Sequence, residues 1–385
     1  GCWALMLVLC SALFAGAGAL AQRGGSSSRA ERLERAASLI ASERLAEAEE
    51  GLSQILKAAP EEATALNLLG AVRAKQGKLD EAETLFARAV RSDAQLAGAH
   101  MNLAFLYLLK REPEKSAASL KEVLRIDPAN ADAAYRLAWL LHSQGRFDEC
   151  IAVAEKLKVT GARSAPLLGV LGDAYLKKGD KVGAVSALKR AVELGPAEPS
   201  HHFALAAAWL KHPPDLQEAE ESLRKFNTLR PEDAQGQLHL GYVLLKQKKH
   251  AEAREWLERS TRAGAGTPEA FYYLGLIAQA QNEDARAIEL FEKSIALAPA
   301  FGHVHVALGS AYLKLKDYTR AQAALETGAK LSPEDSKAHY NLALLYARLK
   351  QPERAREEML IVERLKSEGK ARDDGESELL APPPR

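Results

Sequence analysis

Cysteine is scarce in this chain, which has three cysteines among 385 residues. Cys2 and Cys10 lie in an apolar segment at the start of the sequence, and Cys150 is the one cysteine in the remainder. An intramolecular disulfide in the body of the protein is therefore excluded. The fold has to be stabilised by the packing of apolar side chains, because no covalent crosslink supports it.

Aromatic residues and an excess of charge are also lacking. Aromatics make up 6% of the chain, and 52 Lys and Arg balance 51 Asp and Glu to leave a formal charge of +1. Nucleic-acid binding needs a basic surface that neutralises phosphates, so no nucleic-acid partner is expected. The densest basic cluster, Lys246, Lys248, Lys249 and His250, is interpreted as a solvated turn between two helices. The abundant residues are Ala, Leu, Glu, Lys and Arg, which favour helices.

Motifs that carry catalysis or bind cofactors are missing as well. The sequence has no glycine-rich loop that would cradle phosphates and no strand–turn–helix nucleophile site. Cys150 occupies a position of small packing residues, which predicts a buried and unreactive thiol. We therefore expect no cofactor and no enzymatic activity.

The histidines do not form a recognisable metal site. His201 with His202, and His303 with His305, have no carboxylate-rich or cysteine-rich cluster beside them. Four histidines share one position of the repeat described below, which indicates a role in the framework: His100, His202, His305 and His339. We expect no metal ion to be bound.

The first 21 residues, GCWALMLVLCSALFAGAGALA, are uncharged and nearly all apolar. Ala19 and Ala21 form a small-x-small site before polar residues, which is the layout of a secretory signal peptide. An uncleaved membrane anchor is the alternative, because about 20 apolar residues span a bilayer. The small, glycine-rich end at 15–21 favours cleavage, and the large residues before Cys10 disfavour a lipoprotein signal. The basic region that usually begins a signal peptide is missing, so we expect the natural sequence to start further upstream.

This segment predicts an exported protein, in the periplasm or cell envelope or secreted. Any membrane contact is expected only through residues 1–21, if they are not cleaved. Residues 22–28, QRGGSSS, have the composition of a flexible linker. Residues 370–385 are polar and end in three prolines and an arginine, which is typical of a disordered tail.

Between these ends the sequence repeats with a period of 34 residues. Small residues recur on one ladder: Ala36, Gly70, Ala104, Ala138, Gly172, Ala206, Gly241, Gly275, Gly309 and Ala343. A second ladder of small residues runs from Ala48 to Ala355. Both contain one step of 35, which predicts one inserted residue between Ala206 and Ala219, in the unit near 199–233. A registered period of this length is typical of repeat architectures.

Residues 302–335 illustrate one unit. Apolar residues recur at helical spacing in two runs, and Asp317 stands between them, where its side chain can cap the second helix. Gly309 and Ala321 permit the two helix backbones to approach closely, and Pro333 suits the turn into the next unit. One hairpin cannot bury its own apolar face, so neighbouring units must stack.

Two consecutive units carry a recognisable set of residues: Leu308, Gly309, Tyr312, Ala321, Leu325 and Pro333, then Leu342, Ala343, Tyr346, Ala355 and Met359. By these residues the units resemble tetratricopeptide repeats. The resemblance covers residues 29–369 and implies an all-α, right-handed α-solenoid of about ten helix–turn–helix units. Arg35 replaces the ladder leucine in the first unit, which we interpret as a polar cap.

The resemblance also implies a binding surface. In this family the first helix of each unit lines a concave groove, and its recurring positions here hold Met101, Phe105, Tyr135, Trp139, Phe203, Leu238, Tyr242, Tyr272, Leu276 and Tyr340. Such residues favour an extended or apolar peptide as ligand. The alternative is that some of them pack between adjacent helices. A clamp for a C-terminal carboxylate is not predicted. Such a clamp needs cations in the groove, and the residue one turn after Asn67 is the uncharged Ala71.

The function that the resemblance implies is that of a non-enzymatic adaptor, which binds partner proteins or extended peptides in the groove. A self-assembling structural scaffold is the alternative, motivated by apolar Met359, Ile361 and Val362 in the last unit. A third alternative is a repeat module of a longer protein.

Overall fold

The computed structural model describes residues 28–211, 213–263 and 266–368. The predicted signal peptide or anchor (1–21), most of the predicted linker (22–28) and the predicted tail (370–385) lie outside the described residues. Within those residues the chain forms 20 α-helices and no strand, which confirms the predicted all-α class. Among these helices, none combines the length and the apolar character that crossing a membrane requires.

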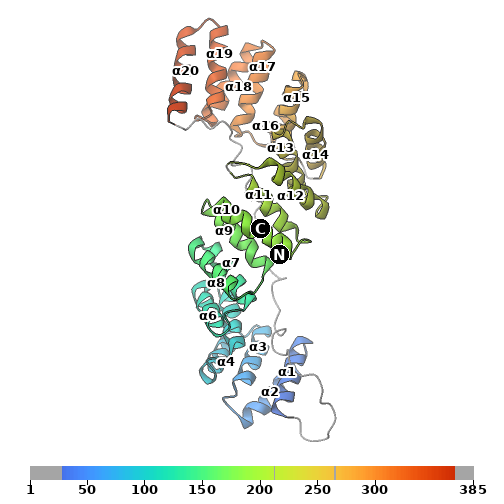
Figure 1. The fold of residues 1–385 in the computed structure, drawn as a ribbon, viewed down its shortest axis with the longest axis vertical. Coiled ribbons are helices and arrows are strands. Elements are labelled where there is room, and N and C mark those ends of the chain that lie inside the picture. Colours follow the sequence, from blue (N-terminus) through green and yellow to red (C-terminus); the bar gives the residue numbers. More distant parts are fainter. Residues whose placement is uncertain (1–27, 212, 264–265, 369–385) are drawn as a thin grey trace. The chain divides into compact units, whose positions relative to one another are not determined.

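The chain divides into two compact units, Gly1–Lys178 and Gly179–Arg385. The helices of the first unit, coloured blue to green in Figure 1, are α1 (Arg29–Ala41), α2 (Leu45–Ala58), α3 (Ala63–Lys75), α4 (Leu79–Ser92), α5 (Ala97–Leu109), α6 (Pro113–Ile126), α7 (Ala131–Ser143), α8 (Phe147–Val159) and α9 (Ala165–Lys177). Here α1 to α8 pair in sequence order into hairpins, and each hairpin packs against the next.

The second unit continues the same pattern. Its helices are α10 (Lys181–Leu194), α11 (Pro199–Trp209), α12 (Leu216–Leu229), α13 (Ala234–Lys246), α14 (His250–Ala263), α15 (Pro268–Ala280), α16 (Asp284–Leu297), α17 (Gly302–Lys314), α18 (Tyr318–Leu331), α19 (Ser336–Arg348) and α20 (Pro352–Ser367). Helices α11 to α20 pair into five hairpins. The 34-residue period thus corresponds to one first helix, a short turn and one second helix, as predicted.

The turn between α17 and α18 is built from two local features. Lys316 lies between α17 and α18 with φ at 61°, a left-handed conformation that reverses the chain direction. Asp317 then caps α18, because its carboxylate accepts a hydrogen bond from the backbone amide of Arg320 at 3.1 Å. This confirms the predicted cap. The equivalent left-handed residue is Gly77 in the second hairpin, where the backbone conformation carries no side-chain penalty.

The two helices of a hairpin approach most closely at the first ladder of small residues. A Cβ atom at Gly309 would lie 2.5 Å from Cγ of Leu325 and 3.1 Å from its backbone nitrogen. At Gly275 a Cβ would lie 2.4 Å from the ring of Phe291. In these hairpins the large side chain of the second helix lies directly over the small residue of the first, and the predicted close approach of the two backbones is confirmed.

The inserted residue of the sixth repeat lies in an enlarged turn. α11 ends at Trp209 and α12 begins at Leu216, whereas α17 ends at Lys314 and α18 begins at Tyr318. The ammonium group of Lys181 donates hydrogen bonds to the carbonyl oxygens of Trp209 at 3.2 Å and Lys211 at 3.1 Å, and also contacts the carbonyl of Pro213. The last carbonyl oxygens of a helix have no donor within the helix. In this enlarged turn, the ammonium group of Lys181 on α10 donates to carbonyl oxygens at and after the end of α11.

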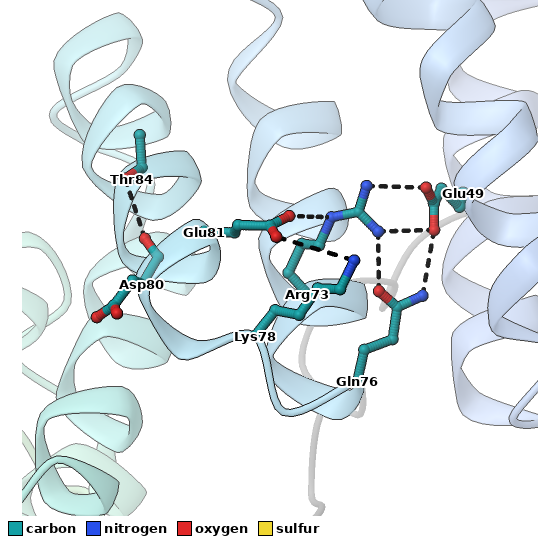
Figure 2. A network of polar contacts seen from close by, with 7 residues as sticks. All are labelled: Glu49, Arg73, Gln76, Lys78, Asp80, Glu81 and Thr84. Carbon is teal, nitrogen blue, oxygen red and sulfur yellow. Dashed lines mark hydrogen bonds and ion pairs between the residues drawn. The ribbon is translucent and has the colours of Figure 1, made fainter.

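Neighbouring hairpins are also joined by ion pairs, and Figure 2 shows the group around Arg73. Its guanidinium donates to both carboxylate oxygens of Glu49 on α2, at 2.7 and 2.8 Å, and to Glu81 on α4 at 2.8 Å. The hydrogen bonds from Arg73 and Gln76 lower the pKa of the Glu49 carboxyl. This pair therefore stabilises the fold above the ordinary pKa of glutamate and ceases to do so as pH falls through the lowered value.

The close approach predicts opposite effects for two Gly→Ala substitutions. Gly309→Ala should lower the free energy of unfolding by about 1–3 kcal/mol, because Leu325 and its backbone leave no room for a methyl group. Gly51→Ala should raise it by about 0.5–1 kcal/mol, because Gly51 lies within α2 and has no atom near its Cβ position.

Urea unfolding followed by circular dichroism measures both changes, with hydrogen exchange to assign them to the first or the second unit. A Gly309→Ala protein as stable as the parent would contradict the packing described for this hairpin.

Candidate protein-binding surface

The first helices α5 and α7 present an apolar and aromatic surface in the first unit. Met101 and Phe105 stand one turn apart on α5, and Tyr135 and Trp139 stand one turn apart on α7, so each pair lies on one side of its helix. The side chain of Trp139 is 44% exposed, and the other three are half-buried. Leu109, at the end of α5, is also exposed. We call these five residues the α5–α7 patch.

A cation on α7 contacts an aromatic ring on α5 within the patch. The guanidinium of Arg136 on α7 lies 4.4 Å from the centroid of the Phe105 ring on α5, which is a cation–π contact. Its Nε donates a hydrogen bond to a carboxylate oxygen of Asp132 at 2.8 Å. Arg136 is thus held in place by Asp132 on one side and covers Phe105 on the other. This leaves Trp139 as the exposed aromatic side chain of the patch.

Trp139 has the features of a contact residue for another protein. Among the described residues it forms no hydrogen bond and no ring contact. A large aromatic side chain with a free indole N–H can contribute both apolar area and one hydrogen bond to a partner. An exposed side chain of this kind is suited to binding another protein.

The second unit places its candidate residues differently. Leu238, Tyr242 and Tyr272 are buried in its hydrophobic core, and Phe203 and Leu276 are partly buried against that core. The ring of Tyr272, for example, lies 5.4 Å from the ring of Tyr273 and 5.3 Å from that of Phe301. These side chains therefore pack between helices, which was the alternative to a place in the groove.

Tyr340 is the exposed candidate of the second unit, with 48% of its surface accessible. Leu344 stands one turn later on α19 and is exposed as well. Neither Leu344 nor Leu109 was singled out from the sequence, although they occupy the ninth and thirteenth positions of their first helices. Their positions in the repeat are the sequence signal that could have identified Leu344 and Leu109 as surface candidates.

The histidines that share one repeat position bind the backbone, which confirms the predicted framework role. The Nε2 atoms of His100, His202, His305 and His339 contact the carbonyl oxygens of Ala94, Pro196, Pro299 and Pro333 at 3.3, 2.9, 2.9 and 3.1 Å. Each ring reaches back six residues to the turn between repeats. Gln237 occupies the same position and donates to the carbonyl of Pro231 at 2.6 Å.

The remaining candidates for chemistry are structural. Cys150 is fully buried on α8, and burial raises the pKa of its thiol to about 11. The thiol therefore stays protonated near neutral pH, as expected for a packing residue. In the part of the chain that the structure describes, no three His, Cys, Asp or Glu side chains are grouped to hold a metal ion.

Comparison with protein families identifies the repeat. A model described as tetratricopeptide repeat matches residues 33–97, 170–226, 215–268 and 306–368, more than half of the chain. Two further models with the same description match residues 107–165 and 268–301.

Individual proteins are similar over part of their length. The protein O-mannosyl-transferase TMTC3 of Homo sapiens is 25% identical over 212 residues, which are 54% of this chain and 19% of that protein. The BBSome complex member BBS4 of Bos taurus is 28% identical over 131 residues, 34% of this chain and 25% of that protein. The chain thus aligns with a quarter or less of these relatives.

A solved structure confirms the predicted fold class. A chain in the crystal structure of the APC/C hetero-tetramer Cut9–Hcn1 superimposes with a TM-score of 0.51 and 19% sequence identity. The match covers 92% of this chain and 83% of that one. At this identity the likeness concerns the fold alone.

The shared histidine position predicts which substitutions the turn tolerates. His202→Gln should leave the stability almost unchanged, because Gln237 makes the same contact in the neighbouring repeat. His202→Leu should lower the free energy of unfolding by about 1 kcal/mol, because the carbonyl of Pro196 loses the donor of a part-buried hydrogen bond. Thermal unfolding of the two variants compares them. Equal losses for Gln and Leu would show that ring packing, and not the hydrogen bond, determines this position.

Proposed function

The chain belongs to the tetratricopeptide repeat family, and on this basis we propose that it is a non-enzymatic adaptor whose α5–α7 patch binds extended, largely apolar segments of partner proteins. The repeats and their fold support a scaffold for protein interactions. The observation that carries the finer proposal is the exposure of Trp139 beside half-buried Tyr135 and Met101. Aromatic residues of this kind contribute much of the free energy of protein binding.

The patch favours a segment of particular chemistry. Its five residues are apolar or aromatic, and the charges of Asp132 and Arg136 beside them are already paired with each other. A partner therefore gains mainly from apolar side chains that cover Trp139 and Leu109. A strongly charged segment finds no unpaired counter-charge in this pair.

Affinity capture with variants of the patch tests this proposal. The double variant Tyr135→Ser, Trp139→Ser should lose a partner that the intact protein captures from its native source, with at least about a tenfold loss of affinity. Val159→Ser is the matched control, because Val159 is an almost fully exposed apolar residue on the second helix α8, outside the patch.

The measurement is cross-linking capture, followed by binding of the purified partner to each variant. Circular dichroism confirms that the double variant keeps its helices. Capture that the double variant and the control reduce equally would overturn the assignment of the patch.

We further propose that the protein is exported and acts in the cell envelope, the periplasm or the extracellular space. The apolar residues 1–21, with the small residues Ala19 and Ala21 before a polar stretch, support this location. The expected outcome is a mature protein that begins near Gln22 and is found outside the cytoplasm. Cell fractionation with N-terminal sequencing of the native protein measures both. Recovery from the cytoplasm with residues 1–21 intact would contradict export.

A further inference from the structure

One position in the second helix is buried in nine repeats and exposed in the tenth. The nine buried residues are each at most 4% exposed: Leu52, Phe86, Leu120, Ala154, Leu188, Leu223, Leu257, Phe291 and Leu325. The tenth is Met359 on α20, the last helix in Figure 1, and it is 38% exposed. The side of α20 around Met359 is therefore open where the other second helices are covered.

Leu360, the next residue, indicates which kind of neighbour this side of α20 would contact. In the two repeats directly before it, the equivalent of Leu360 is a glutamate that accepts a hydrogen bond from a tyrosine of the following first helix. Tyr346 donates to Glu326 at 2.9 Å, and Tyr312 donates to Glu292 at 3.0 Å. Leu360 is apolar and 58% exposed. This position faces a neighbouring helix in those repeats, and on α20 it carries a side chain that water solvates poorly.

The sequence had suggested a somewhat different apolar surface at this end. Met359 is exposed as expected, but Val362 is buried and Ile361 is half-buried, because these residues turn toward the interior of the last hairpin. Leu360 takes their place on the outer side. The open apolar surface of α20 thus consists of Met359 and Leu360.

The charges of α20 divide in the same way. Those that turn inward are paired: Glu358 contacts His339 at 2.7 Å and Arg354 contacts Glu326 at 3.4 Å. Four charges lie on the side of Met359 and Leu360, are exposed and form no ion pair with any described residue: Glu353, Arg356, Glu363 and Lys366. Glu357 and Arg364 are also exposed and unpaired among the described residues, but they lie further around the helix. Opposite charges thus flank Met359 and Leu360 and lack partners within the described part of the chain.

These charges are complementary to themselves when two copies of the helix run antiparallel. With a two-fold axis between Met359 and Leu360, Arg356 lies opposite Glu363 of the second copy, and Glu353 lies opposite Lys366. Each pair occurs twice, because an interface about a two-fold axis uses the same surface on both subunits. Met359 and Leu360 of each copy meet at the centre and cover each other.

We propose that two copies of this protein associate through an antiparallel pairing of their α20 helices. The contact is one helix of 16 residues, roughly 24 Å long, on each side. Such a contact is small compared with the roughly 1,600 Å² of a standard stable interface. The dimer is therefore weak and concentration-dependent. It uses none of the residues of the α5–α7 patch and does not depend on that patch binding a partner.

Sedimentation velocity of the full chain over a wide range of concentration tests the association. The parent protein should change from monomer to dimer as its concentration rises. Leu360→Glu should raise the dissociation constant at least about tenfold, because it places a carboxylate in the apolar centre. Lys330→Glu is the control for a change in charge, since Lys330 is exposed on α18 and lies outside the pairing.

Charge reversal tests the antiparallel register. Arg356→Glu and Glu363→Arg should each weaken self-association, because each places like charges opposite one another. An equimolar mixture of these two variants should form a heterodimer, since every pair across the axis is then opposite in charge. The double variant Arg356→Glu, Glu363→Arg should associate like the parent for the same reason.

Several outcomes would overturn the proposal. A parent protein that stays monomeric at all concentrations excludes the dimer, including the case in which residues 369–385 cover α20 instead. Self-association that Leu360→Glu does not change excludes this helix as the interface. Single charge variants that fail to pair with each other exclude the register. Loss of the dimer in the Tyr135→Ser, Trp139→Ser protein would assign self-association to the α5–α7 patch, and that too would overturn the pairing of α20.

Discussion

The structure depends on the close contact, made in several hairpins, between a small residue of the first helix and a large side chain of the second helix. Gly309 lies under Leu325 and Gly275 under Phe291, at distances that exclude a further methyl group without a shift of the neighbour. Because the contact fixes how the two helices of a hairpin pack, it also determines which sides remain to meet the next hairpin.

Much of the fold was predictable from the sequence because it depends on period and residue size. The ladder through Gly309 and Ala343, the cap at Asp317 and the enlarged turn near Pro213 all have local causes, and the structure places them as predicted. The backbone contacts of His202 and its equivalents were inferred from a shared position, although their carbonyl partners were not. A hydrogen bond to a backbone carbonyl six residues earlier does not depend on the side chain of that residue, so the sequence carries no pattern that predicts it.

The candidate surface was less predictable, because equivalent positions of a repeat need not be equally exposed. Tyr242 and Trp139 occupy the same position in their helices, yet Tyr242 is buried and Trp139 is exposed. The difference lies in the neighbours: Tyr242 lies against Tyr273 of the next repeat, whereas Trp139 has no ring beside it among the described residues. Whether such a residue meets another side chain or solvent depends on the size of residues 30 or more positions away, which no single-unit pattern contains.

The restriction of packing to consecutive hairpins within each unit has a consequence for how such a chain can change over evolutionary time. Since a hairpin such as α15 with α16 touches only the hairpins before and after it, its contacts repeat those of its neighbours. Duplication or loss of 34 residues in register therefore alters one junction and leaves the remaining contacts intact. The 35-residue unit shows that even an out-of-register insertion survives where a cation such as Lys181 binds the freed carbonyl oxygens. Gene duplication can thus lengthen this protein without a new core having to arise.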